Sequence, residues 1–137
     1  MRERYERRLF RLFEEAGYSP VRILTITPEE LFIGSGAAPE LVAVLHALTT
    51  PGSEILAIAP YFPEYKPFVE GTGAAFKVVP PDVPGFQIDL ARLEAMLTPN
   101  TQAVIVNSPN NPSGVVYTAG TLSALGEILT RKGDEFG

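Results

Sequence analysis

The sequence contains no cysteine, and its only histidine is His46. The absence of cysteine excludes a disulfide framework, a thiolate metal site and a cysteine nucleophile. A single histidine leaves too few imidazoles for a zinc cluster and makes a Ser-His-Asp triad hard to build. We therefore expect no metal site, and any chemistry must rest on other residue types.

Long apolar runs and an excess of positive charge are missing as well. No run approaches the roughly 18 apolar residues of a membrane-spanning helix, and the N-terminus is Arg-rich, unlike a signal peptide. With 11 Lys and Arg against 16 Asp and Glu, the formal net charge is −5. Such a charge disfavours nucleic acid and anionic membranes as partners. The sequence therefore predicts a cytoplasmic protein without a nucleic-acid or membrane partner.

The remaining pattern is an alternation of apolar segments with Pro- and Gly-rich connections. Short apolar runs typical of buried strands occupy residues 31–34, 55–58, 75–79 and 103–106. Helical spacing occupies residues 2–16, the segment after residue 36 up to Pro51, and residues 65–70, 89–97 and 118–132. Alternating strands and helices predict an α/β fold, a three-layer αβα arrangement around a mainly parallel sheet. We divide the chain into an N-terminal helix and connector (1–30) and an incomplete α/β domain (31–137).

Helix boundaries and inward faces follow from the same spacing. Asp89 is the expected N-cap of the helix at 89–97. Residues expected on inward helix faces are Leu41, Val44, Leu45, Leu48, Leu90, Leu93, Leu97, Leu122, Leu125, Ile128 and Leu129.

Three loops of unusual composition follow predicted strands, at the carboxyl ends where open α/β sheets bind ligands. The first, 34–40, runs into a helix whose first N–H groups form a ready anion site. Pro39 costs no hydrogen bond there, whereas the Glu40 carboxylate would compete with a phosphate. The string matches neither the P-loop nor the dinucleotide fingerprint, so a plain strand-to-helix turn remains the alternative.

The second loop, 60–65, is aromatic, and the third, 107–114, is rich in amides. Tyr61, Phe62 and Tyr65 offer a face for stacking a planar ring, or are ordinary core aromatics. The third loop places three Asn and two Ser within eight residues directly after a buried strand. Because an amide donates a hydrogen bond without ionising, this loop favours a binding site over a simple turn.

The string Asn110-Asn111-Pro112-Ser113-Gly114 resembles the Asn-Pro-(Ser/Thr)-Gly motif of fold type I aminotransferases, which depend on pyridoxal 5′-phosphate (PLP). A strand at 103–106 before it and Val115-Val116-Tyr117 after it strengthen the resemblance. The two other loops occur in the family's order and rough spacing. From about residue 30 to 137 the chain is most similar to the first half of the large domain of aspartate aminotransferase-like, class I/II enzymes.

This resemblance implies a role for five residues. The N–H groups of Ala37 and Ala38, after Gly36, would hold the cofactor phosphate. Phe62 would stack on the pyridine ring, and Asn111 would donate to its 3′-oxygen near the substrate carboxylate. The implied reaction moves an amino group between an amino acid, for example aspartate, and a 2-oxo acid.

Two further implications concern the same loops. Tyr61 and Tyr65 are weaker alternatives for stacking on the ring. The family often has cis peptide bonds before the prolines that correspond to Pro60 and Pro112, where the cis form is cheapest.

The resemblance also implies groups that this chain lacks. Transamination needs a Schiff-base lysine, an acid for the pyridine nitrogen and an arginine for the substrate carboxylate, and in the family these follow the Asn-Pro-Ser-Gly motif. Lys66, Lys77 and Lys132 are the only lysines, and none stands in the expected context. We therefore predict no catalytic residue here, no turnover by the chain alone, and open strand edges that favour a homo-oligomer. Alternatives are another fold type I enzyme, such as a carbon–sulfur lyase, or a non-catalytic PLP-fold module.

Overall fold

The structure is a computed structural model that describes residues 34–136. The predicted N-terminal helix at 2–16, its connector and residues 31–33 of the first predicted strand lie outside the described residues. Gly34, the described end of that strand, belongs to no strand. The proposed division of the chain at residue 30 stays a prediction.

Strands and helices alternate through the described residues, as the sequence predicts. In chain order the elements are α2 (Ala37–Leu48), β1 (Glu54–Ile58), α3 (Tyr65–Glu70), β2 (Ala75–Val79), α4 (Leu90–Met96), β3 (Thr101–Ile105) and α5 (Ala119–Phe136). The last helix ends four residues later than predicted, and β3 begins and ends slightly earlier. Asp89 is the N-cap of α4, as expected, and its Oδ1 accepts a hydrogen bond from the Arg92 N–H at 3.0 Å.

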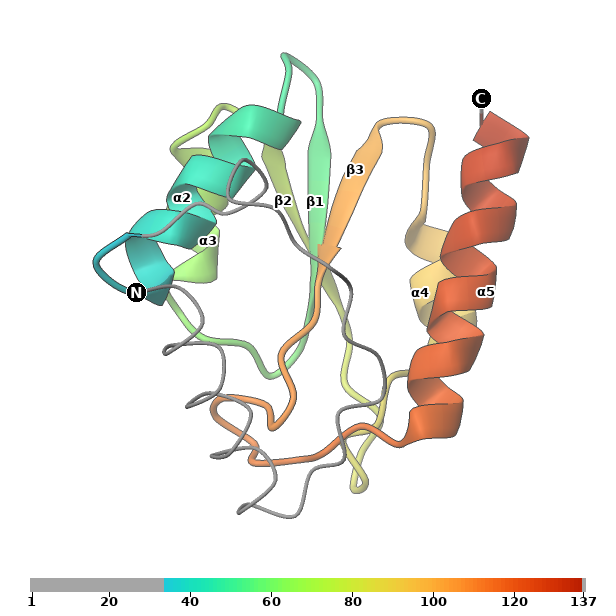
Figure 1. The fold of residues 1–137 in the computed structure, drawn as a ribbon. Coiled ribbons are helices and arrows are strands. Elements are labelled where there is room, and N and C mark those ends of the chain that lie inside the picture. Colours follow the sequence, from blue (N-terminus) through green and yellow to red (C-terminus); the bar gives the residue numbers. More distant parts are fainter. Residues whose placement is uncertain (1–33, 137) are drawn as a thin grey trace, which may run out of the picture. The chain divides into compact units, whose positions relative to one another are not determined.

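The sheet is parallel and runs in the order β2-β1-β3. The central strand β1 is the most apolar, and Ile55, Leu56, Ala57 and Ile58 are all buried. Helices α2 and α3 cover one face of the sheet, and α4 and α5 cover the other (Figure 1). The α/β class and the three-layer arrangement are therefore confirmed.

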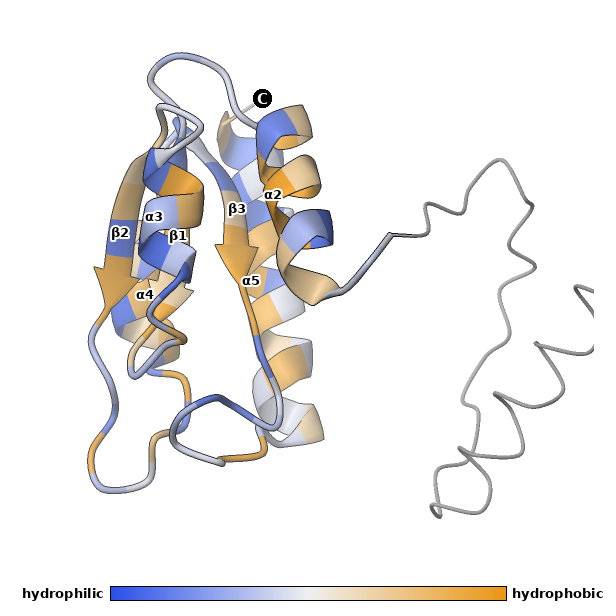
Figure 2. Cartoon of the chain, turned by 90° about the vertical axis from the view of Figure 1, so that its left-hand side faces the viewer, coloured by the Kyte–Doolittle hydropathy of each residue, from blue (hydrophilic) through white to orange (hydrophobic). Residues whose placement is uncertain are grey.

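Two apolar clusters lie on opposite faces because successive side chains of a strand alternate between its faces. Ile55 packs with Leu45 and Val69 on the side of α2 and α3. Its neighbour Leu56 packs with Leu93 on the side of α4 and α5. The strands accordingly appear mostly orange, for hydrophobic, in Figure 2.

The predicted inward faces of α2 and α5 are too wide. Leu45 is the one buried residue of α2, and Leu125 is the one buried residue of α5. Exposure reaches 52% at Val44, 45% at Leu48, 39% at Leu122 and 36% at Leu129. The described sheet is only three strands wide, so each helix rests on it along a narrow stripe. Figure 2 shows hydrophobic and hydrophilic residues side by side on the face of α2 turned toward the viewer.

Within residues 34–136, no helix combines the length and apolar character needed to cross a membrane.

Candidate cofactor-binding site

A pocket of about 500 Å³ lies at the carboxyl ends of β1 and β3. Its walls come from the start of α2, from the aromatic loop and α3 after β1, and from the chain after β3. Its lining residues are Ala37, Ala38, Glu40, Leu41, Val44, Phe62, Tyr65, Phe68, Ile105, Val106, Asn107 and Asn111. Because parallel strands all end at one edge of the sheet, loops distant in sequence meet here.

The first wall is the N-terminal turn of α2. Gly36 precedes the helix with φ 132° and ψ 166°, a backbone conformation that residues with a Cβ rarely adopt. No side chain caps this helix end, and Ala37 and Ala38 are exposed. Both residues line the pocket at the positively polarised end of the helix, where free N–H groups suit an anion.

Glu40 adds a negative charge to the same wall. It belongs to the first turn of α2, and its carboxylate lies where a side chain of residue 34 would be. Because Gly34 has no side chain, the Glu40 carboxylate can occupy this space. An anion bound at the start of α2 would have this carboxylate as a neighbour.

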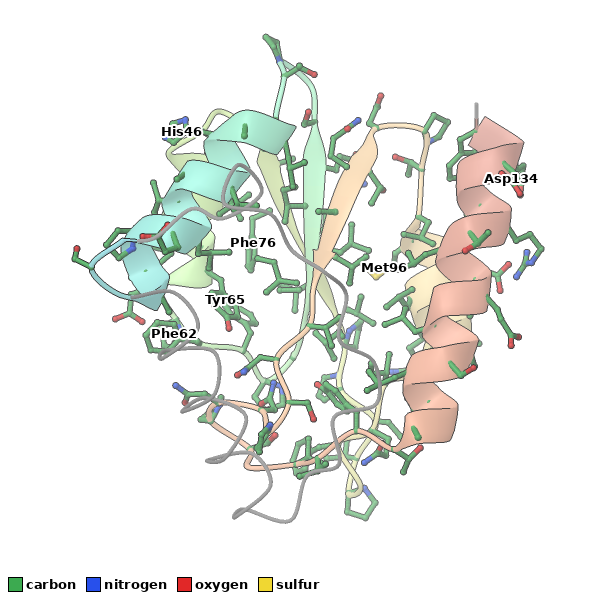
Figure 3. All side chains as sticks on the ribbon, viewed as in Figure 1. His46, Phe62, Tyr65, Phe76, Met96 and Asp134 are labelled. Carbon is green, nitrogen blue, oxygen red and sulfur yellow. The ribbon has the colours of Figure 1, made fainter. Side chains whose placement is uncertain are left out.

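The second wall is aromatic, and only part of the aromatic loop contributes to it. Phe62 and Tyr65 line the pocket and meet edge to face, with ring centroids 5.7 Å apart and an interplanar angle of 72°. Tyr61 packs instead on Phe76, at 5.0 Å and 71°. Figure 3 shows Phe62 and Tyr65 together at this end of the sheet, with Phe76 deeper between helices and strands. Burial raises the pKa of the Tyr65 hydroxyl above its ordinary value.

The third wall carries two amides. The Asn111 N–H donates to Asn107 Oδ1 at 2.9 Å, which fixes the backbone at the pocket. The Asn111 residue is exposed and lines the pocket. Its neighbour Asn110 is buried, and its Oδ1 accepts hydrogen bonds from the Ser113 hydroxyl at 2.8 Å and the Ser113 N–H at 3.3 Å. The two adjacent asparagines therefore differ in position: Asn110 makes hydrogen bonds inside the loop, and Asn111 lines the pocket.

Both cis peptide bonds that the family resemblance implies are present, Ala59-Pro60 and Asn111-Pro112. The structure also has cis bonds at Val83-Pro84 and Ser108-Pro109.

The predicted site residues come together in this structure. One pocket is lined by four of them, Ala37, Ala38, Phe62 and Asn111. The fifth, Gly36, immediately precedes α2 and does not line the pocket. Their roles toward a cofactor stay predictions. The prediction omitted Asn107, although its position directly after the last buried strand was a usable signal. The apolar lining residues Phe68, Ile105 and Val106 give no comparable signal in the sequence.

The three lysines of the chain lie elsewhere. Lys66 pairs with Glu70 at 3.9 Å, Lys77 with Glu54 at 2.6 Å, and Lys132 with Glu135 at 2.6 Å. None of them lines the pocket.

A parallel α/β sheet that gathers a helix N-terminus, an aromatic face and amide donors around one pocket is suited to a ligand with both a phosphate and a planar ring. The family model for "Aminotransferase class I and II" matches residues 3–133. The chain therefore belongs to the class I and II aminotransferases, a family whose members use PLP.

Individual relatives agree with this assignment. The chain is 40% identical over 110 residues to a probable aspartate/prephenate aminotransferase of Thermus aquaticus, covering 77% of this chain and 28% of the relative. It is 42% identical over 101 residues to a probable N-succinyldiaminopimelate aminotransferase of Mycobacterium tuberculosis, covering 72% and 25%. The chain thus spans about a quarter of the length of these curated relatives.

Solved structures share the fold. An aminotransferase from Eubacterium rectale aligns with a TM-score of 0.73 at 48% identity, over 74% of this chain and 26% of that one. The aspartate aminotransferase of Thermus thermophilus with maleate aligns with a TM-score of 0.75 at 35% identity, over 79% and 28%.

Proposed function

We propose that residues 34–136 form the phosphate- and ring-binding part of the PLP site of an aminotransferase. The complete enzyme would move an amino group between an amino acid and a 2-oxo acid, act in amino-acid biosynthesis, and work as a cytoplasmic homo-oligomer. Aspartate is the amino acid we favour, because the names of several relatives include it. The observation that supports the proposal is that the start of α2, Phe62 and Asn111 share one pocket.

The residues present fit the cofactor. The Ala37 and Ala38 N–H groups would donate to its phosphate, and the Phe62 ring would lie against its pyridine ring. The Asn111 side-chain amide would donate to the phenolic oxygen of the ring. Glu40 is the one lining group whose charge opposes the phosphate.

When bound, PLP supplies an electron sink for the bonds at the amino-acid α-carbon. The chain's own part would be to hold and orient that ring, through donors that need not lose a proton. Since no lysine lines the pocket, we propose that the 137 residues alone bind the cofactor without turnover.

The test uses pyridoxine 5′-phosphate, which has the phosphate and the ring but no aldehyde that reacts with surface lysines. Its Kd for the 137-residue chain is measured by the fluorescence of the ring, with pyridoxine as the matched ligand lacking the phosphate. We expect the phosphorylated ligand to bind at least tenfold more tightly, because hydrogen bonds to a charged group contribute about 1.5–3 kcal/mol. Equal affinity for the two ligands, or no binding of either, would contradict the proposal.

Ala37→Pro tests the wall formed by α2. Proline is favoured at the first helical position, and the extended ψ of Gly36 suits a following proline, so the helix should persist. The variant lacks one N–H at the phosphate, and we expect its Kd for pyridoxine 5′-phosphate to rise about tenfold. Ala37→Gly, which keeps the N–H, is the control and should bind like the wild type.

A further inference from the structure

We propose that Tyr117 is a positioning residue, which fixes the loop at 107–114 to the core of the domain and so holds Asn111 at the pocket. The inference rests on the proposed function and extends it to a residue that does not itself line the pocket. Tyr117 would act on a ligand only through Asn111.

The Tyr117 ring belongs to the apolar core. The residue is only 4% exposed, and it packs with Leu56 and Leu93 in the cluster on the side of α4 and α5. Leu56 lies on the central strand β1, and Leu93 is a buried residue of α4. Because core side chains are close-packed, the ring has a fixed position from which the adjoining loop can be held.

Two hydrogen bonds connect Tyr117 to the loop. Its N–H donates to the Ser108 Oγ at 3.0 Å, nine residues earlier in the chain. Its hydroxyl forms a hydrogen bond with the Asn110 side chain. Burial raises the pKa of this hydroxyl and the hydrogen bond lowers it, so the Asn110 amide is the donor and the tyrosine oxygen the acceptor. The Asn110 Oδ1 already accepts from Ser113, and the NH₂ group is the part of the side chain that remains for Tyr117.

The loop passes this position on to Asn111, which follows Asn110 directly. The Asn111 N–H donates to the Asn107 Oδ1 at 2.9 Å, and the Asn110 N–H donates to the Val115 carbonyl at 2.8 Å. These contacts close the loop on itself, so its orientation toward the pocket depends on what anchors it to the rest of the domain. A hydrogen bond weakens steeply as its angle departs from the optimum, and a small rotation of the loop would therefore cost affinity at Asn111.

The experiment measures Kd with the 137-residue chain for pyridoxine 5′-phosphate and for inorganic phosphate. Tyr117→Phe keeps the ring in the core and removes the hydroxyl. We expect its Kd for pyridoxine 5′-phosphate to rise about threefold, and its Kd for inorganic phosphate, which needs only the start of α2, to stay unchanged. Tyr61→Phe is the matched control, because it is the same chemical change at a tyrosine that packs on Phe76 and does not line the pocket. It should bind both ligands as the wild type does.

The double variant that combines Tyr117→Phe with Asn111→Ala separates positioning from a general structural effect. If Tyr117 acts through Asn111, its hydroxyl has no effect once the Asn111 amide is gone, and the double variant should bind as Asn111→Ala does. In the NMR spectrum of the ligand-free chain, Tyr117→Phe should shift the side-chain amide resonances of Asn110 and Asn111. Tyr61→Phe should leave these resonances in place.

The other outcomes overturn the inference in distinguishable ways. A loss of affinity in Tyr117→Phe that persists in the Asn111→Ala background, or that is equal for inorganic phosphate, is a structural effect and leaves only the proposed function standing. Wild-type affinity in Tyr117→Phe, or an unmoved Asn111 amide resonance, shows that the hydroxyl does not hold Asn111. If the wild-type chain binds no pyridoxine 5′-phosphate, the proposed function fails first, and the role of Tyr117 in ligand binding fails with it.

Discussion

The two ends of the parallel sheet differ in whether their polar groups have hydrogen-bond or ion-pair partners within the chain. At the amino end, Glu54 of β1 forms an ion pair with Lys77 of β2 at 2.6 Å and accepts a hydrogen bond from the Thr98 hydroxyl at 2.7 Å. The Glu54 N–H donates to the Asn100 carbonyl at 2.8 Å, which ties the chain before β3 to β1. These polar groups satisfy one another.

At the carboxyl end, fewer of the polar groups around the pocket have partners within the described residues. The first N–H groups of α2 have no side-chain cap, and the exposed Asn111 lines the pocket together with Tyr65. Groups that partner each other stabilise the fold, and groups left to a ligand contribute little to it. Substitutions at the amino end should therefore change stability, and substitutions at the carboxyl end should change binding.

The largest effect is expected for Glu54→Ala. The change leaves the Lys77 ammonium and the Thr98 hydroxyl without their partner. Because Lys77 is a third exposed, water compensates part of the loss. We expect a decrease in the free energy of unfolding of about 1–3 kcal/mol, measured by urea titration followed by circular dichroism. An unchanged urea midpoint would show that the amino end does not stabilise the sheet.

The same carboxylate predicts a dependence on pH. Lys77 first, and Thr98 second, hold the pKa of the Glu54 carboxyl below its ordinary range. A folded-state pKa below the unfolded one stabilises the protein above the ordinary carboxyl pKa, about 4.3. This stabilisation is lost as the pH falls through the lowered pKa. The stability difference between the wild type and Glu54→Gln should therefore narrow as the pH is lowered from about 7 to about 3.

Much of this arrangement could be predicted from the sequence, because local signals determine it. Gly and Pro mark where strands end, and the family motif around Asn111 lies in one of those loops. Which aromatic side chain reaches the pocket could not be predicted. Tyr61 and Tyr65 are equivalent by composition, and only the path of the chain from β1 into α3 separates them.

The extent of helix burial could not be predicted either. Helical spacing places Val44 and Leu48 on the same face as Leu45, yet both are substantially exposed. Spacing identifies the face that turns inward, whereas the width of the sheet beneath it determines how many residues are covered. That width depends on strand pairing, which is a property of the assembled fold.

A smaller effect is expected for substitutions of Asn110 and Asn111. These two adjacent residues allow the same comparison, between a group that stabilises the fold and a group that binds ligand. Asn110→Ala removes a buried acceptor from the Ser113 N–H and hydroxyl, and we expect it to cost about 1–2 kcal/mol of stability. Asn111→Ala removes an exposed amide and should leave the urea midpoint within error. It should instead raise the Kd of pyridoxine 5′-phosphate about fivefold. The reverse pattern would contradict the assignment of Asn111 to the pocket.

The smallest effect is expected for Glu40→Gln. Glu40 differs from the other polar groups at the carboxyl end because its charge should oppose ligand binding. Glu40 is a charged residue of the first turn of α2 that lines the pocket. Like charges repel even through water, by about 1 kcal/mol at 4 Å. Glutamine keeps the shape and removes the charge, so the affinity for pyridoxine 5′-phosphate should rise about threefold, and less at high salt because ions screen the repulsion. Glu64→Gln makes the same charge change on an exposed residue that does not line the pocket. An equal gain in both variants would assign the effect to net charge, whereas a gain confined to Glu40→Gln would place the phosphate at the start of α2.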